Sequence, residues 1–265
     1  MNFLNIENKT FLITGVSNKK SVAFTVAKTL KEYGANVLFT VQNTNQMSII
    51  EKFFPGDLTM ICDVEDEHNI KDVANELKEK NISLDGLLHS IAFANYSEGP
   101  KDFLETKKDD FLQATQISCF SFVQLANGLK DLLKPDSSLV TVSISSTKAT
   151  PYGYMGPIKA MLDGTVPFMA KSLSSQKIRV NSICSGPLKT SASAGIPGYI
   201  DNYLYAERLT LRNEALKTQE VADTIAFLLS PRSSGINAER IVVDAGMGSN
   251  YFDQNIVKSV VDQLN

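Results

Sequence analysis

Histidine, cysteine and tryptophan are scarce in this chain of 265 residues, and their scarcity restricts its chemistry. The only histidines are His68 and His89, and no clustered ligands accompany them, so we expect no metal site. Cys62, Cys119 and Cys184 are an odd number of cysteines without C-x-x-C spacing, each beside apolar neighbours. They are therefore predicted to be buried, reduced thiols.

Long apolar runs and an excess of positive charge are also absent. No stretch reaches membrane-spanning length and no charged-then-apolar leader follows Met1, so we expect a cytoplasmic protein with no membrane partner. A net charge of -3 supplies no basic stripe, so nucleic acid is not an expected partner. The length and the 43% hydrophobic content fit a single domain over residues 1–265.

What is present is an alternation of short apolar runs and helical stretches. Strands are predicted at 9–14, 36–41, 58–62, 84–90, 139–144, 178–184 and 240–244. Helices are predicted over 21–33, 65–80, 109–133, a stretch beginning at Tyr152, and 220–229. This order predicts an α/β fold: a Rossmann-like, doubly wound parallel sheet of about seven strands with helices on both faces.

Ligands of such sheets bind at the carboxyl ends of the strands. The residues expected to form one rim there are Gly15, Asp63, Ser90, Ile144 and 185–187. The segment 188–212 contains Gly195, Pro197 and Gly198 and interrupts the alternation. A substrate-binding lid and an ordinary surface excursion are both consistent with it.

The most informative spacing is that of Tyr152 and Lys159, which are seven residues apart and follow the apolar run 138–144. If a helix starts at Tyr152, seven residues cover nearly two turns, so both side chains would lie on one face. A free tyrosine has a pKa near ~10, and a fixed ammonium nearby would lower that pKa and stabilise a developing oxyanion. Two unrelated residues on an amphipathic helix would show the same spacing.

The loop 15–23 joins the first predicted strand to the first helix. Backbone amides at a helix start attract pyrophosphate, and Gly15 would allow its close approach. The loop does not match G-x-G-x-x-G, so taken alone it is equally well a plain connection.

Together these segments resemble the enoyl-acyl-carrier-protein reductases, a divergent branch of the short-chain dehydrogenase/reductases, over almost the full chain. The six-residue gap between Tyr152 and Lys159 is specific, because ordinary members of the superfamily have a gap of three. The other matching motifs are Gly15-Val16 with Ser21-Val22-Ala23, Phe39-Thr40-Val41-Gln42-Asn43, Cys62-Asp63-Val64, His89-Ser90-Ile91-Ala92-Phe93-Ala94, Arg179-Val180-Asn181, Ser185-Gly186-Pro187-Leu188-Lys189-Thr190 and Val243-Asp244-Ala245-Gly246.

The resemblance implies NADH-dependent reduction of the trans-2 double bond of an enoyl thioester in fatty-acid synthesis. Tyr152 would stabilise the enolate oxygen, and Lys159 would hold the nicotinamide ribose and supply positive charge. An acyl carrier protein is the implied carrier of the substrate, and a dimer or tetramer is the implied assembly. The implied contacts with NAD are made by Gly15, Ser21, Val22, Gln42, Asp63, Val64, Ser90, Ile91, Ala92, Lys159, Gly186, Pro187, Leu188 and Thr190.

The cofactor preference depends on the end of the second predicted strand. Gln42 replaces the acidic residue that often holds the adenosine ribose, and no Arg or Lys lies between Val41 and Glu51. A 2′-phosphate would find no cationic partner there, which favours NADH over NADPH.

Three departures from the family pattern bear on the substrate and the assembly. Ile144 replaces a second active-site aromatic, and Ser145 or Ser146 is a candidate for a nearby hydroxyl. Pro167 lies inside the helix after Tyr152, a helix that usually packs across a subunit interface, and is expected to kink it.

Tyr154 competes with Tyr152 for the catalytic place, although the spacing favours Tyr152. The predicted lid stretch 195–203 has no basic residue, which weakens the steering of an acidic carrier protein. A reductase of the same fold acting on another enone or ketone, and a cofactor-binding paralogue without catalysis, are therefore the alternatives.

Overall fold

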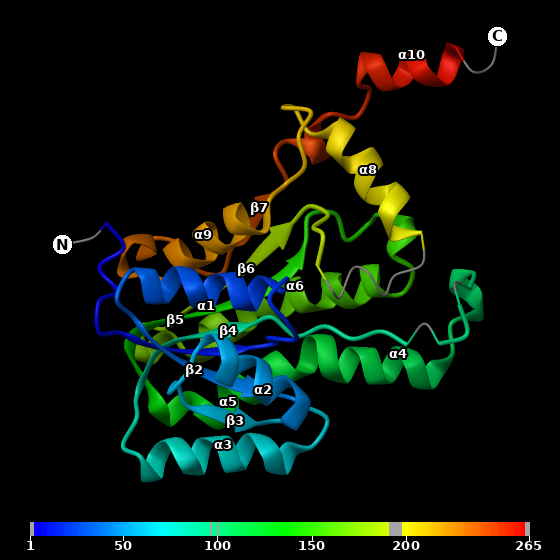
Figure 1. The fold of residues 1–265 in the computed structure, drawn as a ribbon. Coiled ribbons are helices and arrows are strands. Elements are labelled where there is room, and N and C mark those ends of the chain that lie inside the picture. The colour runs from blue at the N-terminus through cyan, green and yellow to red at the C-terminus, as the bar shows by residue number, and fades with distance from the viewer. Residues whose placement is uncertain (1–2, 96, 100, 191–197, 263–265) are drawn as a thin grey trace.

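The computed structural model describes residues 3–95, 97–99, 101–190 and 198–262. It contains a seven-stranded sheet in the order β3-β2-β1-β4-β5-β6-β7, in which every neighbouring pair is parallel (Figure 1). The strands are β1 (Thr10–Thr14), β2 (Asn36–Val41), β3 (Thr59–Ile61), β4 (Leu84–His89), β5 (Leu133–Ile144), β6 (Arg179–Ser185) and β7 (Arg240–Val243). The predicted α/β architecture is confirmed.

Helices cover both faces of the sheet (Figure 1). The α-helices of the described residues are α1 (Val22–Glu32), α2 (Thr44–Phe53), α3 (Glu67–Glu79), α4 (Lys108–Thr115), α5 (Ser121–Leu129), α6 (Met155–Ser172), α8 (Tyr199–Leu209), α9 (Thr218–Leu229) and α10 (Gln254–Asp262). Helix α10 extends beyond the body and covers neither face of the sheet. In the described part of the chain, no helix is long and apolar enough to cross a membrane.

A hydrophobic core lies on each side of the sheet. Successive strand side chains point to opposite faces, so Leu12 of β1 enters one core while Phe11 and Ile13 enter the other. Helices α3, α5 and α6 close the core on the Leu12 side, and α1 and α9 close the other. Cys62, Cys119 and Cys184 are buried and unpaired, as predicted.

Asp85 joins the amino-terminal ends of the three central strands. From β4, its carboxylate accepts hydrogen bonds from Lys9 Nζ (3.1 Å) and Thr10 N (2.9 Å) at the start of β1. It also accepts one from Lys134 Nζ of β5 (2.7 Å). This end of the sheet is therefore held by charge-assisted bonds, away from the carboxyl ends where ligands bind.

The predicted helix over 109–133 was wrong in its continuity. The chain instead forms α4, a π-helical segment (Gln116–Phe120), α5 and a short 3₁₀ turn, and β5 already begins at Leu133. In the π-helical segment, Ser118 Oγ accepts a hydrogen bond from Phe93 N (2.9 Å) and donates one to Phe93 O (3.0 Å). This contact with the chain after β4 accompanies the wider turn, which sequence periodicity does not reveal.

Three helices, α2, α8 and α10, were not among the predicted helices. α2 follows Asn43, whose side chain accepts from the amides of Asn45 and Gln46, so a cap begins a helix of weak apolar periodicity. α10 lies beyond the last strand and has no buried side chain. In α6, Pro157 is in the first turn as expected, and the helix continues through Pro167 to Ser172.

Candidate active site

The parallel sheet brings the predicted rim residues to one edge. Gly15 directly follows β1 and Gln42 directly follows β2, and Asp63 and Val64 lie two and three residues after β3. On the other side of β1, Ser90 follows β4 and Ile144 ends β5. The remaining rim residues follow β4 and β6, and are Ile91, Ala92, Gly186, Pro187, Leu188 and Thr190.

Gly15 lies directly against the end of β4. Its φ is +85°, and a Cβ added there would be 2.0 Å from Ser90 O. Next to it, Thr14 Oγ1 donates to Leu88 O (3.0 Å) and accepts from Ser90 N (3.4 Å). Only glycine permits this close contact between the end of β4 and the point where the first loop begins.

Ser21 caps α1, so the predicted helix start is correct to within one residue. Its Oγ donates to Asn18 O (2.8 Å) and accepts from Phe24 N (3.3 Å). The cap uses one amide of the first turn and fixes the direction of the others, and Val22 is buried as the first helical residue. The amino end of α1 thus lies at the rim with the polarity that attracts an anion.

Gln42 and Asp63 face each other across the ends of β2 and β3. Gln42 Nε2 donates to Asp63 Oδ2 (3.3 Å), and Asp63 Oδ1 accepts from Glu65 N (3.1 Å). Asp63 N donates to Asn69 Oδ1 (3.1 Å), which fixes the backbone after β3. This corner presents a carboxylate and an amide side chain.

Tyr152 does not start a helix, which corrects the sequence prediction. It ends a 3₁₀ turn (Thr150–Tyr152), and Gly153 follows with φ +53° before α6 begins at Met155. The predicted arrangement of Tyr152 and Lys159 on one helix face is therefore wrong. The tyrosine is carried by the turn, and the lysine by the second turn of α6.

Lys159 is 6% exposed, and its Nζ donates to Val142 O of β5 at 2.8 Å. Burial lowers the pKa of its ammonium to about 8, although Asp163 opposes this shift. Burial also raises the pKa of Tyr152, and the Tyr199 hydroxyl adds to that effect. The pKa of Tyr152 is thus raised, whereas Lys159 was expected from the sequence to lower it.

His89 is a neutral, hydrogen-bonded side chain in the core near Lys159. Its Nδ1 is 2.7 Å from Thr141 Oγ1 and its Nε2 is 2.9 Å from Ser121 Oγ. Because Ser121 Oγ donates to Ile117 O (2.6 Å), we assign the proton of His89 to Nε2. Burial, with Lys159 adding to it, lowers the pKa of His89 to about 3, so the ring is neutral at pH 7.

An ion pair that sequence reasoning missed fixes the end of β5. Arg240 of β7 donates from Nε to Asp163 Oδ2 of α6 (2.8 Å). Its Nη2 donates to Ile144 O (2.9 Å) and Ser145 O (2.6 Å). In the sequence, Asp163 is four residues after Lys159 on the same helix. Nothing in the sequence indicated that Arg240 is the partner of Asp163.

The predicted lid is described only in part, because residues 191–197 lie outside the described residues. Tyr199, the first residue of α8, accepts from Leu188 N (2.8 Å) and donates to Leu188 O (2.9 Å) through its hydroxyl. Lys189 Nζ lies 4.5 Å from the centroid of the Tyr203 ring. Helix α8 is therefore tied directly to the chain that leaves β6.

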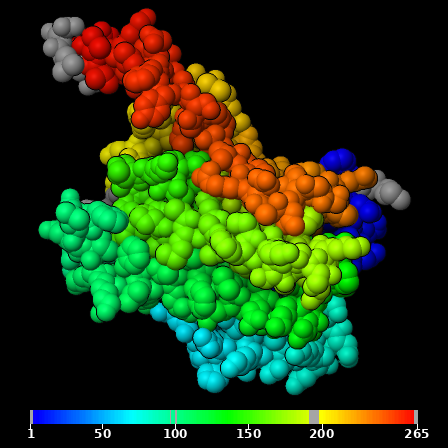
Figure 2. Space-filling view, turned by 180° about the vertical axis from the view of Figure 1, so that it is seen from behind, coloured from blue at the N-terminus to red at the C-terminus, as the bar shows by residue number. Residues whose placement is uncertain are grey.

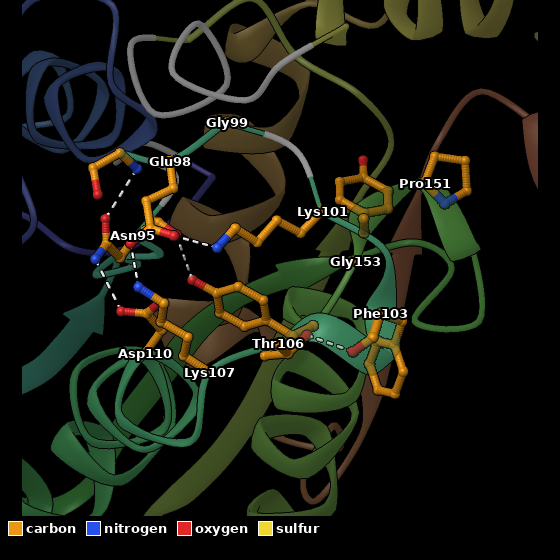
Figure 3. Close-up of a pocket in the computed structure, with 13 residues that line it drawn as sticks. Asn95, Glu98, Gly99, Lys101, Phe103, Thr106, Lys107, Asp110, Pro151 and Gly153 are labelled. Carbon is orange, nitrogen blue, oxygen red and sulfur yellow. Dashed lines mark hydrogen bonds and ion pairs between the residues drawn. The ribbon is translucent and has the colours of Figure 1, made fainter.

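A cavity of about 100 Å³ lies beside Tyr152, between the segment after β4 and the 3₁₀ turn. Figure 3 shows Glu98 between Lys101 and Lys107, with which it forms ion pairs. Asn95 Nδ2 donates to Asp110 Oδ1 (2.9 Å) on the same wall. One wall of this cavity is thus polar, whereas Phe103, Pro151, Tyr152 and Tyr154 contribute apolar and aromatic surface.

Tyr154 also lines this cavity but is held differently from Tyr152. It is buried, and its hydroxyl donates to Asn95 O at 3.1 Å. Its ring centroid is 6.3 Å from that of Phe111. A hydroxyl bonded to a backbone carbonyl has its proton engaged, which favours Tyr152 as the donor to a substrate.

These geometric features agree with the comparisons to known proteins. The model of the family described as "Enoyl-(Acyl carrier protein) reductase" matches residues 15–248. The chain belongs to this family. The resemblance noted from the Tyr152–Lys159 gap and the rim motifs is thereby confirmed.

Individual members of the family show how closely the chain follows it. The enoyl-[acyl-carrier-protein] reductase [NADH] FabI of Enterococcus faecalis is 36% identical, with 91% of this chain and 98% of the relative covered. The [NADPH] FabI of Staphylococcus aureus is 34% identical, with 92% and 98% covered. The crystal structure of the NADH enzyme of Aquifex aeolicus superposes with a TM-score of 0.87 at 32% identity, covering 92% of this chain and 97% of that one.

Proposed function

We propose that this protein reduces the trans-2 double bond of an enoyl thioester, carried by acyl carrier protein, with NADH as reductant. The observation that carries the proposal is the buried ammonium of Lys159 at the rim, close in the chain to the turn that presents Tyr152. Family membership supports the same reaction. We further propose that the segment 188–212 acts as the lid over the substrate.

The rim fits a dinucleotide by two tests. Gly15, at φ +85°, begins the first loop in close contact with Ser90 and leads to the amino end of α1, where a pyrophosphate is favoured. Lys159 has three N–H donors, and among the described residues only Val142 O accepts from it. Two donors therefore remain for the hydroxyls of a ribose.

In this proposal, Asp63 and Val64 lie beside the adenine and Gln42 near its ribose. The middle of the proposed cofactor site is lined by Ser90, Ile91 and Ala92. The residues after β6 that flank the nicotinamide and the phosphates are Gly186, Pro187, Leu188 and Thr190.

The chemistry of the chain itself rests on Tyr152 and Lys159. Bound NADH would supply a hydride to the β-carbon of the thioester, and a proton taken up from solvent at the α-carbon would complete the reduction. The Tyr152 hydroxyl would donate a hydrogen bond to the thioester carbonyl oxygen, and this bond strengthens as negative charge develops there. The positive charge of Lys159 would stabilise the negative charge that develops on this oxygen. The high pKa of Tyr152 keeps its proton in place, so the hydroxyl is a donor throughout.

NADH is the proposed reductant because the Gln42–Asp63 corner presents a carboxylate oxygen and no cation among residues 42–50. A 2′-phosphate would meet the charge of Asp63, whereas ribose hydroxyls can donate to it. Relatives named for NADH and for NADPH both exist, so the two cofactors should be compared directly.

The test is a steady-state assay of NADH and NADPH oxidation with crotonyl- and longer enoyl thioesters on coenzyme A and acyl carrier protein. We expect turnover with NADH, and a loss of at least about 100-fold in kcat for Tyr152→Phe. Tyr154→Phe is the matched control, with a change of less than about tenfold. Absence of turnover with every enoyl thioester would reject the proposed function.

A second candidate, reduction of a more polar enone or ketone, is favoured by one observation. The cavity beside Tyr152 is lined by Glu98, Lys101, Lys107 and Asp110, which suit polar substituents better than a long alkyl chain. Turnover of small enones combined with no activity on carrier-bound enoyl chains would support it. Tight NADH binding without any turnover would instead indicate the non-catalytic paralogue.

We also propose that the protein is a cytoplasmic homo-oligomer. Met161 and Phe168 are exposed on the outer side of α6, the helix that the family resemblance places at a subunit interface. Three buried free thiols fit a reducing compartment. Sedimentation of the purified protein tests the assembly.

A further inference from the structure

Helix α10 carries an apolar stripe that its own chain leaves exposed. The stripe consists of two pairs of residues one turn apart, Ile256 with Val260 and Val257 with Val261. The four side chains therefore lie on one side of the helix. Just before the helix, Tyr251 and Phe252 are 85% and 74% exposed. No side chain within Gln254–Asp262 is buried.

The arm that carries this stripe is a built element. Asp253 Oδ1 accepts from Asn255 N (2.9 Å) and Ile256 N (3.1 Å), which caps the helix. Asn250 Nδ2 donates to Leu209 O at the end of α8 (2.9 Å), which anchors the base of the arm. Figures 1 and 2 show the arm extending beyond the body, and it lies past residue 248, where the family match ends.

A second exposed apolar surface lies on α8. Tyr199, Tyr203 and Ala206 form the buried side of this helix. Ile200 and Leu204, one turn apart on another side, are 70% and 49% exposed. Exposed Tyr205 and Leu211 extend this α8 surface. A helix that is apolar on its outer side needs cover from another molecule or element.

Charge argues for a protein as the cover. Helices that lie on membranes carry Lys and Arg along the polar face, whereas α10 has Lys258 and Asp262 and is capped by Asp253. Helix α8 contains Asp201, Glu207 and Arg208, so it has one more acidic than basic side chain and can offer a carboxylate to Lys258. Both surfaces are apolar, and neither helix has the excess of basic side chains that membrane-surface helices carry.

The available area is sufficient for a stable contact. Tyr251 and Phe252 alone expose on the order of 300 Å² per copy, given roughly 150–250 Å² for a whole aromatic side chain. The stripe of α10 and the exposed side chains of the α8 surface add to this area. A standard interface buries about 800 Å² per partner.

We propose that α10 packs on the α8 surface of a second copy of this chain, and that the exchange is reciprocal. In a dimer with a two-fold axis, the α10 stripe of each copy packs on the α8 surface of the other. Both stripes and both α8 surfaces are then covered. This contact is separate from the proposed α6 interface and does not depend on the proposed reaction.

The test is cross-linking between two different full-length variants. One chain carries Ile200→Cys or Leu204→Cys, and the other carries Val257→Cys or Val260→Cys. The three native cysteines are buried, so the background with a short bis-maleimide is low. We expect at least one of the four mixed pairs to give a cross-linked heterodimer.

Two matched variants make the result specific. Adding Val261→Asp to the α10 cysteine chain places a carboxylate in the stripe, so the yield of the mixed cross-link should fall by at least about tenfold. Adding Ser259→Asp, on the other side of the helix, should leave the yield within about twofold. Equal effects of the two substitutions would overturn the proposal.

Three other outcomes would also overturn it. One is a cross-link that forms only when both cysteines are in the same chain, which would place α10 on its own α8. Another is a wild-type protein that sediments as a monomer at micromolar concentration. The last is α10-dependent flotation of the wild-type protein with phosphatidylcholine–phosphatidylglycerol vesicles, which would assign the stripe to lipid.

Discussion

At the scale of single residues, Gly15 is the position with the least freedom to change. Its φ of +85° disfavours any side chain, and the Ser90 carbonyl occupies the place of a Cβ. Both constraints act at the strand end where the first loop turns toward α1. A side chain there would separate the ends of β1 and β4.

We therefore expect Gly15→Ala to lower the free energy of unfolding by about 2–4 kcal/mol. Gly56→Ala is the matched control, because Gly56 has the same φ of +85° with nothing within 4 Å of its added Cβ. That variant should lose only about 1–2 kcal/mol. Urea unfolding of both variants measures the difference, and equal losses would mean that the contact with Ser90 relaxes freely.

Lys159 leads to a prediction about pH. Because its pKa is lowered to about 8, the ammonium is present below that pH and lost above it. We expect kcat/KM for NADH, which reports the free enzyme, to fall as pH rises through about 8. A Lys159→Arg variant keeps its charge, so any residual activity should show no fall in this range. The same fall in both proteins would assign it to another group.

At the scale of secondary-structure elements, Arg240 connects three of them. It links β7 to α6 through Asp163 and to the end of β5 through two carbonyls. The side chain thus fixes the backbone at Ile144, the residue expected from the sequence in place of a second active-site aromatic. No other described residue bridges these same groups. We therefore expect the loss of Arg240 to change the substrate pocket.

Arg240→Met is expected to lower the free energy of unfolding by about 1–3 kcal/mol. We expect it to raise KM for the thioester by about tenfold while the Kd for NADH changes less. Arg232→Met removes another guanidinium with a backbone bond, to Phe3 O, and should leave both constants unchanged. Equal increases of KM and Kd would show a general loss of structure at the rim.

The sequence predicted the strands well and the local geometry around them less well. Apolar runs such as β1, buried over all but its first residue, leave little choice of structure. The turn at Tyr152 depends on Gly153 at positive φ and on contacts of the chain before α6, which periodicity does not encode. The Arg240–Asp163 pair joins residues 77 positions apart, so only the tertiary fold reveals it.

At the scale of the whole molecule, the two ends of the sheet have separate tasks. The carboxyl ends carry the rim, and the amino ends are held by Asp85. Burial opposes the ionisation of Asp85, but hydrogen bonds from Lys134, Thr10 N and Lys9 outweigh it and hold the pKa of this carboxyl below its ordinary value. Its charge therefore stabilises the fold at neutral pH.

Asp85→Asn should lower the free energy of unfolding at pH 7 by about 1–3 kcal/mol without changing KM. A lowered pKa gives stability above the unfolded value that is lost as pH falls through the folded one. The difference between wild type and variant should therefore shrink below pH ~4. Glu76→Gln, in an exposed pair with Lys80, should change stability by no more than about 0.5 kcal/mol. A pH-independent difference would contradict the assigned role.

The distance between the two ends of the chain has a practical consequence for handling the protein. Phe3 lies under Arg232, near the end of α9, whereas α10 stands beyond α8 on the other side of the rim (Figure 1). An affinity tag before residue 3 would therefore hang from the back of the sheet. The same tag after α10 would sit on the arm beyond α8. Purification, labelling and surface immobilisation should accordingly all use the amino end.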